Sequence, residues 1–115
     1  MSDAVRRFRD ERERLNAKVL AAGNLTVKRF FALDTQAYAP GALDAKTKEL
    51  LGLASSAVLR CDDCILYHII RCVEEGATDD EILEALSISL LVGGSIVIPH
   101  LRRAIDRLDE LRVAE

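Results

Sequence analysis

The sequence is poor in large aromatic residues, with no tryptophan and only three phenylalanines and two tyrosines among 115 residues. A hydrophobic core with so few aromatic rings must be built from leucine, isoleucine, valine and alanine, a composition that suits packed helices. The sequence also lacks any window of strict alternation between apolar and polar residues, the pattern that indicates a strand. We therefore expect one all-α domain over residues 1–115, folded as a helical bundle of five to seven helices.

An excess of positive charge is missing as well, because 16 lysines and arginines are outnumbered by 19 aspartates and glutamates. Without a basic surface there is little non-specific attraction to phosphate backbones, so we expect no nucleic-acid partner. The longest stretch without a formal charge, residues 85–101, is interrupted by Gly93, Gly94 and Pro99 and falls short of the ~18 apolar residues of a membrane span. The charged N-terminal residues do not resemble a secretory signal, so we expect a cytoplasmic protein without membrane contact.

Apolar residues recur at helical spacing in six segments, and capping residues mark several of their ends. Asp44 is a predicted N-cap, and Gly76 is predicted to end a helix in the left-handed conformation. Thr78 and Glu81 are predicted to form a capping box. The segments cover residues 3–22, 26–39, 45–60, 61–75, 78–92 and 95–113.

The apolar faces of these segments differ in width, and this predicts how deeply each segment is buried. Residues 45–60 leave almost no polar face and should form a central helix, and residues 82–92 should be covered on several sides. Residues 3–22 carry only a thin apolar stripe between dense charges of both signs. That helix either packs lightly on its own domain or lies against another subunit.

Cysteine is scarce too, with only three residues. In the reducing compartment expected for this chain permanent disulfides are rare, so a close pair of cysteines is more often catalytic or metal-binding. Cys61, Cys64 and His68 are three, four and seven positions apart, so on a helix they share one side. Unpaired N–H groups at a helix start favour the thiolate, and His68 can accept a thiol proton and deliver it to a leaving group. The spacing predicts a thiol-redox site. Cys72 falls on the same side of the helix, and we expect it to be a core residue.

The same residues leave a metal site open as an alternative. Cys61, Cys64, His68 and His100 could supply four zinc ligands. One regular helix, however, spreads the first three over about two turns, roughly 10 Å, which is more than one metal ion can collect. His100, which follows Pro99, fits the start of a helix better than a ligand position. We therefore expect no metal and no prosthetic group.

Several motifs together resemble the core of the AhpD-like alkylhydroperoxidase and carboxymuconolactone decarboxylase family. They are Glu49, the motif Cys61-x-x-Cys64-x-x-x-His68, the segment from Gly76 to Ile82, and Gly93-Gly94. The resemblance covers about residues 43–111 and implies an AhpD-like helical fold that assembles into homo-oligomers, such as trimers or hexamers. It also implies a peroxiredoxin-type activity, in which paired thiols reduce a small hydroperoxide or disulfide and a dithiol reductant restores them.

By this resemblance, Cys64 corresponds to the thiol that meets the peroxide, Cys61 to the thiol that resolves the sulfenic acid, and Glu49 and His68 to a proton relay. One residue departs from the family pattern. Asp63 stands where well-studied peroxidases of the family have a histidine, and an acid there raises the pKa of the neighbouring thiol. From the sequence alone, Glu49 also fits a solvated charge on a helix surface.

Two other functions remain open at this point. One is a cofactor-free lactone decarboxylase or isomerase that uses Glu49 and His68 and does not need the thiols. The other is a non-enzymatic, oligomeric binding module in which the cysteines are only part of the core. Alkylation of the thiols separates the first alternative from the redox enzyme.

Overall fold

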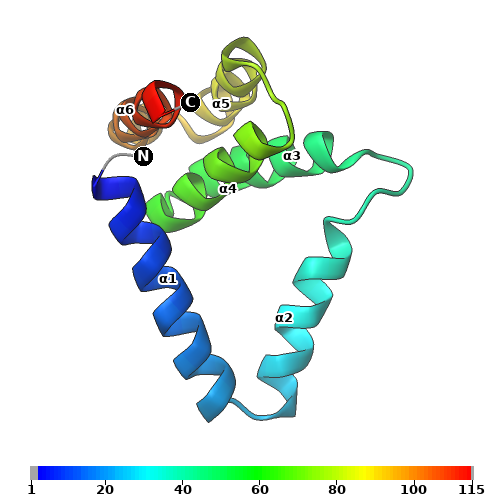
Figure 1. Ribbon diagram of the computed structural model, residues 1–115. Coiled ribbons are helices and arrows are strands. Elements are labelled where there is room, and N and C mark those ends of the chain that lie inside the picture. The colour runs from blue at the N-terminus through cyan, green and yellow to red at the C-terminus, as the bar shows by residue number, and fades with distance from the viewer. Residues whose placement is uncertain (1–2, 115) are drawn as a thin grey trace.

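The computed structural model describes residues 3–114, and within this range every regular element is helical (Figure 1). The prediction of an all-α fold with five to seven helices is confirmed, because the described residues form six α-helices and one short 3₁₀ helix. These are α1 (Asp3–Ala22), α2 (Leu25–Ala37), α3 (Ala45–Val58), α4 (Asp62–Glu74), α5 (Asp79–Gly93), η1 (Ser95–Val97) and α6 (Ile98–Ala114). Among the described residues, none of the helices is long and apolar enough to cross a membrane.

The predicted capping residues start and end the helices as expected. Oδ1 of Asp44 accepts the N–H of Thr47 at 2.8 Å at the start of α3. Thr78 and Glu81 form the reciprocal capping box of α5, with hydrogen bonds of 3.1 and 2.9 Å. Gly76 follows α4 with a φ of +84°, a conformation that glycine adopts without strain. Local sequence signals therefore set these ends.

Four helices, α2, α3, α4 and α6, are shorter at one or both ends than their apolar spacing predicts. α2 ends at Ala37 rather than at residue 39, and α3 ends at Val58 rather than at residue 60. α4 begins at Asp62, because Cys61 has extended backbone and serves as the N-cap. α6 begins at Ile98 rather than at residue 95, because residues 95–97 form the 3₁₀ helix η1.

Helices α3 to α6 form the body of the molecule. As predicted, α3 is central, since it packs against both α4 and α5, while α4 also packs against α6. The core consists of aliphatic side chains that are almost fully shielded from solvent, among them Leu53, Ile69, Ile82, Leu86 and Val97. Cys72 is also fully buried in this core, which agrees with the predicted packing role.

The expectation that α5 is covered on several sides is wrong for the single chain. Ile88, Leu91 and Val92 are 58%, 82% and 69% exposed. Only α3 and η1 make substantial contact with α5, so these side chains point away from the body. One face of α5 is therefore apolar and exposed in the single chain.

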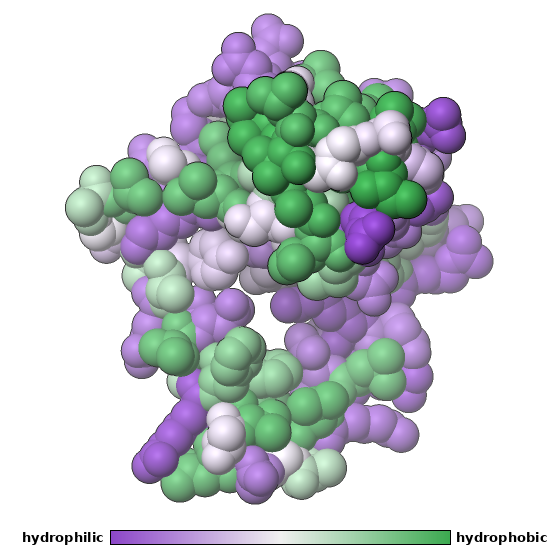
Figure 2. Space-filling model, turned by 180° about the vertical axis from the view of Figure 1, so that it is seen from behind, coloured by the Kyte–Doolittle hydropathy of each residue, from purple (hydrophilic) through white to green (hydrophobic). Residues whose placement is uncertain are grey.

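Helices α1 and α2 extend from the body as the two arms of a V that meet near Gly23 (Figure 1). Only the first turns of α1 are anchored, with Val5 fully buried and Phe8 packed against the core. Further out, Phe30 and Leu33 of α2 are 67% and 63% exposed. Figure 2 shows apolar side chains at the surface of this lower part of the molecule, with an opening between it and the body above.

Candidate active site

Cys61 and Cys64 are joined by a disulfide bond at the start of α4, with their Cα atoms 5.2 Å apart. The backbone N–H of Cys64 lies 3.3 Å from Sγ of Cys61 and donates to it. Cys64 is exposed, whereas Cys61 is half-buried. In the reduced protein the first cysteine would therefore receive the helix-start N–H, and the second would be open to a substrate.

The link between α3 and α4 fixes the position of Cys61. Arg60 has a φ of +60°, in the left-handed region that usually holds glycine. Its N–H donates to the carbonyl oxygen of Ala57 at 3.0 Å, and the N–H of Cys61 donates to that of Ser56 at 3.2 Å. This pair of bonds is a Schellman motif, and a non-glycine residue in it costs about 1–2 kcal/mol. The chain thus accepts local strain directly before the first cysteine.

Glu49 and His68 form a buried pair between α3 and α4. Oε1 of Glu49 lies 2.8 Å from Nδ1 of His68, and the two residues are only 2% and 8% exposed. Nε of Arg71 lies 3.4 Å from Oε2 of the same carboxylate. The interpretation of Glu49 as a solvated surface charge is therefore wrong. A carboxylate on Nδ1 favours the tautomer in which Nε2 of His68 is free to accept a proton.

Tyr38, just after α2, reaches the other side of the imidazole. Its hydroxyl lies 3.4 Å from Nε2 of His68, and the two rings are in contact. Burial raises the pKa of Tyr38, and the negative charges of Asp34 and Glu49 raise it further. The hydroxyl therefore stays protonated at neutral pH and can donate to Nε2. The sequence contained no signal for this residue, because α2 and α4 are far apart along the chain.

Gly52 of α3 makes the space in which these two rings meet. A Cβ atom at this position would lie 2.6 Å from the Tyr38 hydroxyl and 2.7 Å from Cε1 of His68, closer than such atoms approach. Gly52 is thus a site residue that the sequence analysis missed. Its signal was a glycine in the middle of an apolar helix, where glycine costs stability unless a close approach requires it.

A cleft of about 510 Å³ is lined by both Cys64 and His68. Cys61 and Glu49 do not line it, and they contact it only through their bonded partners, Cys64 and His68. The remaining wall includes Phe8, Arg12 and Leu15 of α1, Asp34 of α2 and Tyr67 of α4. The cleft is therefore bounded by the two arms and the body together.

Tyr67 and Arg12 tie the α1 arm to this cleft. The ring of Tyr67 packs edge-on against His68 with 5.1 Å between centroids, and the Arg12 guanidinium lies 4.0 Å above the Tyr67 ring. A cation over an aromatic face is an attractive contact. The position of α1 is thereby coupled to the histidine.

The remaining candidates lie outside this cleft. Burial raises the pKa of the Cys72 thiol to about 12, so this thiol stays protonated and unreactive. His100 is in the first turn of α6 and binds Asp62 at 2.7 Å rather than facing the imidazole of His68. In residues 3–114 no group of three or more histidine, cysteine or acidic side chains is arranged to hold a metal ion.

Comparison of the sequence with known proteins identifies a protein family. Residues 24–107 match the carboxymuconolactone decarboxylase family. A protein of Paracoccus denitrificans, called uncharacterized protein 4 in cox locus, is 35% identical over 82 residues, which are 71% of this chain and 74% of that protein. An uncharacterized protein of Cupriavidus necator is 32% identical over 71 residues, covering 62% of this chain and 63% of its own length.

Solved structures are similar over nearly the whole chain. A crystal structure of a Thermotoga maritima protein is 64% identical with a TM-score of 0.93, covering 94% of this chain and 95% of that one. A second Thermotoga maritima structure, also 64% identical, has a TM-score of 0.89 and covers 92% and 90% of the two chains. It is described as a carboxymuconolactone decarboxylase family protein, with a suggested involvement in the antioxidative response. An apo structure of a Legionella pneumophila member of the family is 29% identical, with a TM-score of 0.86 over 95% and 97% of the chains.

Proposed function

The chain belongs to the carboxymuconolactone decarboxylase family, and we propose that it is a thiol-dependent peroxidase or disulfide reductase. The observation that carries this proposal is the disulfide of Cys61 and Cys64, whose exposed sulfur shares a cleft with a histidine held by a buried glutamate. The suggested antioxidative involvement of the Thermotoga maritima relative supports it. We name Cys64, Cys61, His68 and Glu49 as its catalytic residues.

In the proposed reaction the Cys64 thiolate attacks the outer oxygen of a hydroperoxide. His68 first takes the proton of the Cys64 thiol. A sulfur–oxygen bond then forms as the oxygen–oxygen bond breaks, and His68 gives this proton to the departing alkoxide, which leaves as an alcohol. The Cys61 thiolate then attacks the sulfur of the Cys64 sulfenic acid. The disulfide forms, and the released hydroxide takes the proton that the Cys61 thiol gave up and becomes water. Two electrons have passed from the thiols to the peroxide.

A dithiol closes the cycle by exchange with the disulfide. One of its sulfurs attacks the exposed Cys64, the Cys61 thiolate leaves, and the second sulfur displaces Cys64, so that the dithiol ends as a disulfide. The disulfide-reductase activity uses the same exchange in the opposite direction, with an external disulfide as the substrate. Both directions need a reducing compartment, and we place the protein in the cytoplasm.

His68 contributes more to this reaction as a proton donor than as an activator of the thiol. Lowering a thiol pKa from ~8.5 to ~6.5 raises the thiolate fraction at neutral pH roughly 25-fold, but it also makes each thiolate a roughly 8-fold weaker nucleophile. The net gain in rate is only about threefold. A positioned acid or base contributes roughly 10² to 10⁴. Glu49 serves this role by fixing the ring and its tautomer from the Nδ1 side.

We also propose that the protein works as a homo-oligomer. Apolar side chains are exposed on α2 and on α5, and the arms of α1 and α2 have few contacts with their own body. Since both arms line the cleft, subunits packed against them would hold the site in shape.

A second function is favoured by one observation. A separate cleft of about 530 Å³ is lined by Tyr38, Gly52 and His68 but not by either bonded cysteine. A histidine that lines a thiol-free cleft, with Glu49 bound to its other ring nitrogen, fits a cofactor-free lyase or isomerase. If alkylation of the reduced thiols leaves a lactone decarboxylase activity intact, this second function replaces the first.

The direct test is hydroperoxide consumption in the presence of a small dithiol. We expect Cys64→Ser to abolish consumption, and Cys72→Ser to serve as a matched control with the wild-type rate. Consumption by Cys64→Ser at the wild-type rate would contradict the proposal.

A further inference from the structure

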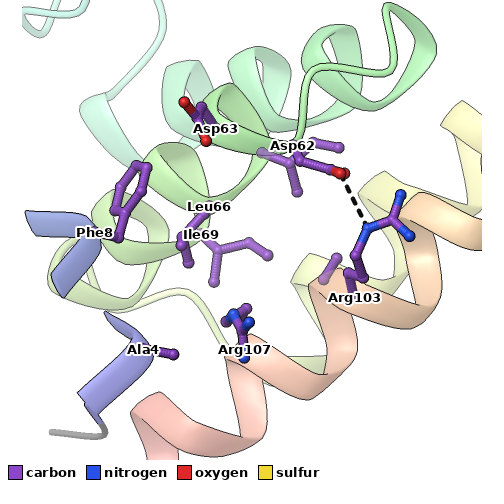
Figure 3. Close-up of a pocket in the computed structure, with 10 residues that line it drawn as sticks. Ala4, Phe8, Asp62, Asp63, Leu66, Ile69, Arg103 and Arg107 are labelled. Carbon is purple, nitrogen blue, oxygen red and sulfur yellow. Dashed lines mark hydrogen bonds and ion pairs between the residues drawn. The ribbon is translucent and has the colours of Figure 1, made fainter. Parts of the chain in front are cut away.

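The two acidic residues between the cysteines lie in different surroundings, although they are neighbours in the sequence. Oδ1 of Asp62 lies 2.7 Å from Nδ1 of His100, and its Oδ2 lies 3.0 Å from Nε of Arg103. Asp63 makes no hydrogen bond or ion pair within the part of the chain that the structure describes. Figure 3 shows the Asp62 carboxylate directed at Arg103 of α6 and the Asp63 carboxylate turned away from it.

This contact borders a different cavity from the substrate cleft, although Phe8 and Asp63 line both. Asp62 and Arg103 line a cavity of about 250 Å³ between α1, α4 and α6, whereas Cys64 and His68 do not line it. Arg103 is 41 positions from Asp62 along the chain, so the contact exists only because α4 packs against α6. A residue there can influence the thiols without touching a substrate.

The charge of Asp62 matters for the thiols because it is one residue away from Cys61. A carboxylate so near a thiolate disfavours ionisation of the thiol. Partial burial raises the pKa of Asp62, but the hydrogen bonds and charges of His100 and Arg103 together lower it by more, so this carboxyl is ionised at neutral pH. Arg103 places a positive charge on the same carboxylate and offsets its field.

We propose that Arg103 and His100 are positioning residues that act through Asp62 to hold the start of α4 and to offset the negative charge beside the reactive thiols. The inference rests on the proposed function in one respect, namely that Cys61 and Cys64 are the reactive pair. It accounts for the charge of one of the two acidic residues between the cysteines, the one beside Cys61. Of the two carboxylates, only Asp62 is compensated.

The test is the pKa of the thiols in the reduced protein, followed by thiolate absorbance in a Cys72→Ser background. We expect Arg103→Gln to raise this pKa by about half a unit, which is roughly a threefold loss of thiolate at neutral pH. Arg102→Gln is the matched control, because Arg102 is an exposed neighbour on the same helix without an ion pair among residues 3–114. It should leave the thiol pKa unchanged.

A double-mutant cycle separates this effect from a loss of packing. In an Asp62→Asn background, Arg103→Gln should no longer shift the thiol pKa, because no carboxylate is left to compensate. In an Asp63→Asn background it should still produce the full shift. His100→Gln should shift the pKa in the same direction as Arg103→Gln, and circular dichroism should show each variant to be folded.

An unchanged thiol pKa in Arg103→Gln, or an equal shift with and without Asp62, overturns the inference. The measurement needs no peroxide. A wild-type protein without peroxidase activity would therefore contradict the proposed function but would leave this test valid. Conversely, an active enzyme with no coupling between Arg103 and Asp62 would sink only the inference.

Discussion

The carboxylate of Glu49 lies 2.8 Å from Nδ1 of His68, although the two residues are 19 positions apart and belong to different helices. Packing of α3 against α4 buries both side chains, so the imidazole is held in one orientation. Preorganisation of this kind makes a proton donor effective, because no reorientation is needed during the reaction. The pair is therefore the place where a single change tests the acid–base half of the site.

Replacing Glu49 by glutamine keeps the size of the side chain and removes its charge. We expect hydroperoxide turnover to fall roughly 10²-fold, because His68 loses the partner that orients its ring. Both thiols should still react with iodoacetamide. The matched control is Glu74→Gln, since Glu74 pairs with the same Arg71 at 3.3 Å but is exposed. Equal turnover in the two variants would contradict a proton-relay role.

A methyl group at Gly52 should disturb the site without altering any polar residue. Gly52→Ala would place Cβ 2.6 Å from the Tyr38 hydroxyl and 2.7 Å from Cε1 of His68, so one ring must move. We expect turnover to fall at least about tenfold, since small misplacements of a catalytic group are costly. Gly41→Ala is the control, because its nearest new contact is Lys48 Nζ at 3.6 Å. If both variants turn over at the wild-type rate, the close approach has no functional role.

Stability should fall at high pH because of Cys72. Burial raises the pKa of this thiol from 9.0 to about 12, so above pH 9 the unfolded chain loses a proton that the folded protein keeps. The free energy of unfolding should then decrease by up to about 1.4 kcal/mol per pH unit from this group. Urea denaturation of the wild type and Cys72→Ala, at neutral pH and near pH 10, measures the difference. A constant difference between the two proteins across this range would refute the shift.

The exposed apolar side chains of α2 should hold subunits together. Phe30 is 67% exposed, and Phe30→Asp would put a charge on the proposed contact surface. We expect sedimentation velocity to show an oligomer for the wild type and smaller species for this variant. Arg29→Asp, a charge reversal at the next exposed position, should keep the wild-type assembly. A monomeric wild-type protein would end the oligomer proposal.

Much of the fold was predictable because its signals are local. Asp44, Gly76 and the pair Thr78 and Glu81 each act within one turn of the chain, so their effect is visible in a short window of sequence. The spacing of Cys61 and Cys64 is local in the same sense. Their disulfide depends on only one turn of helix and its N-cap.

The parts that could not be predicted depend on contacts between distant segments. Tyr38 faces His68 from 30 positions away, and Arg103 reaches Asp62 from 41 positions away, so no window of sequence contains either pair. Burial of Glu49 follows from the packing of α3 on α4 and could be inferred only through the family resemblance. The exposure of the apolar side chains of α5 was not predicted for another reason. An apolar sequence does not say whether the surface that would cover it lies in the same chain.

The most direct measurement of the redox claim is the intact mass of the reduced protein after one equivalent of hydroperoxide. The wild type and Cys72→Ser should each lose two hydrogens, and a dithiol should restore them. Cys61→Ser should instead gain one oxygen at Cys64, because no resolving thiol is present, and Cys64→Ser should stay unchanged. A wild-type mass that does not change, or a loss of two hydrogens that persists in Cys64→Ser, would contradict the proposed chemistry.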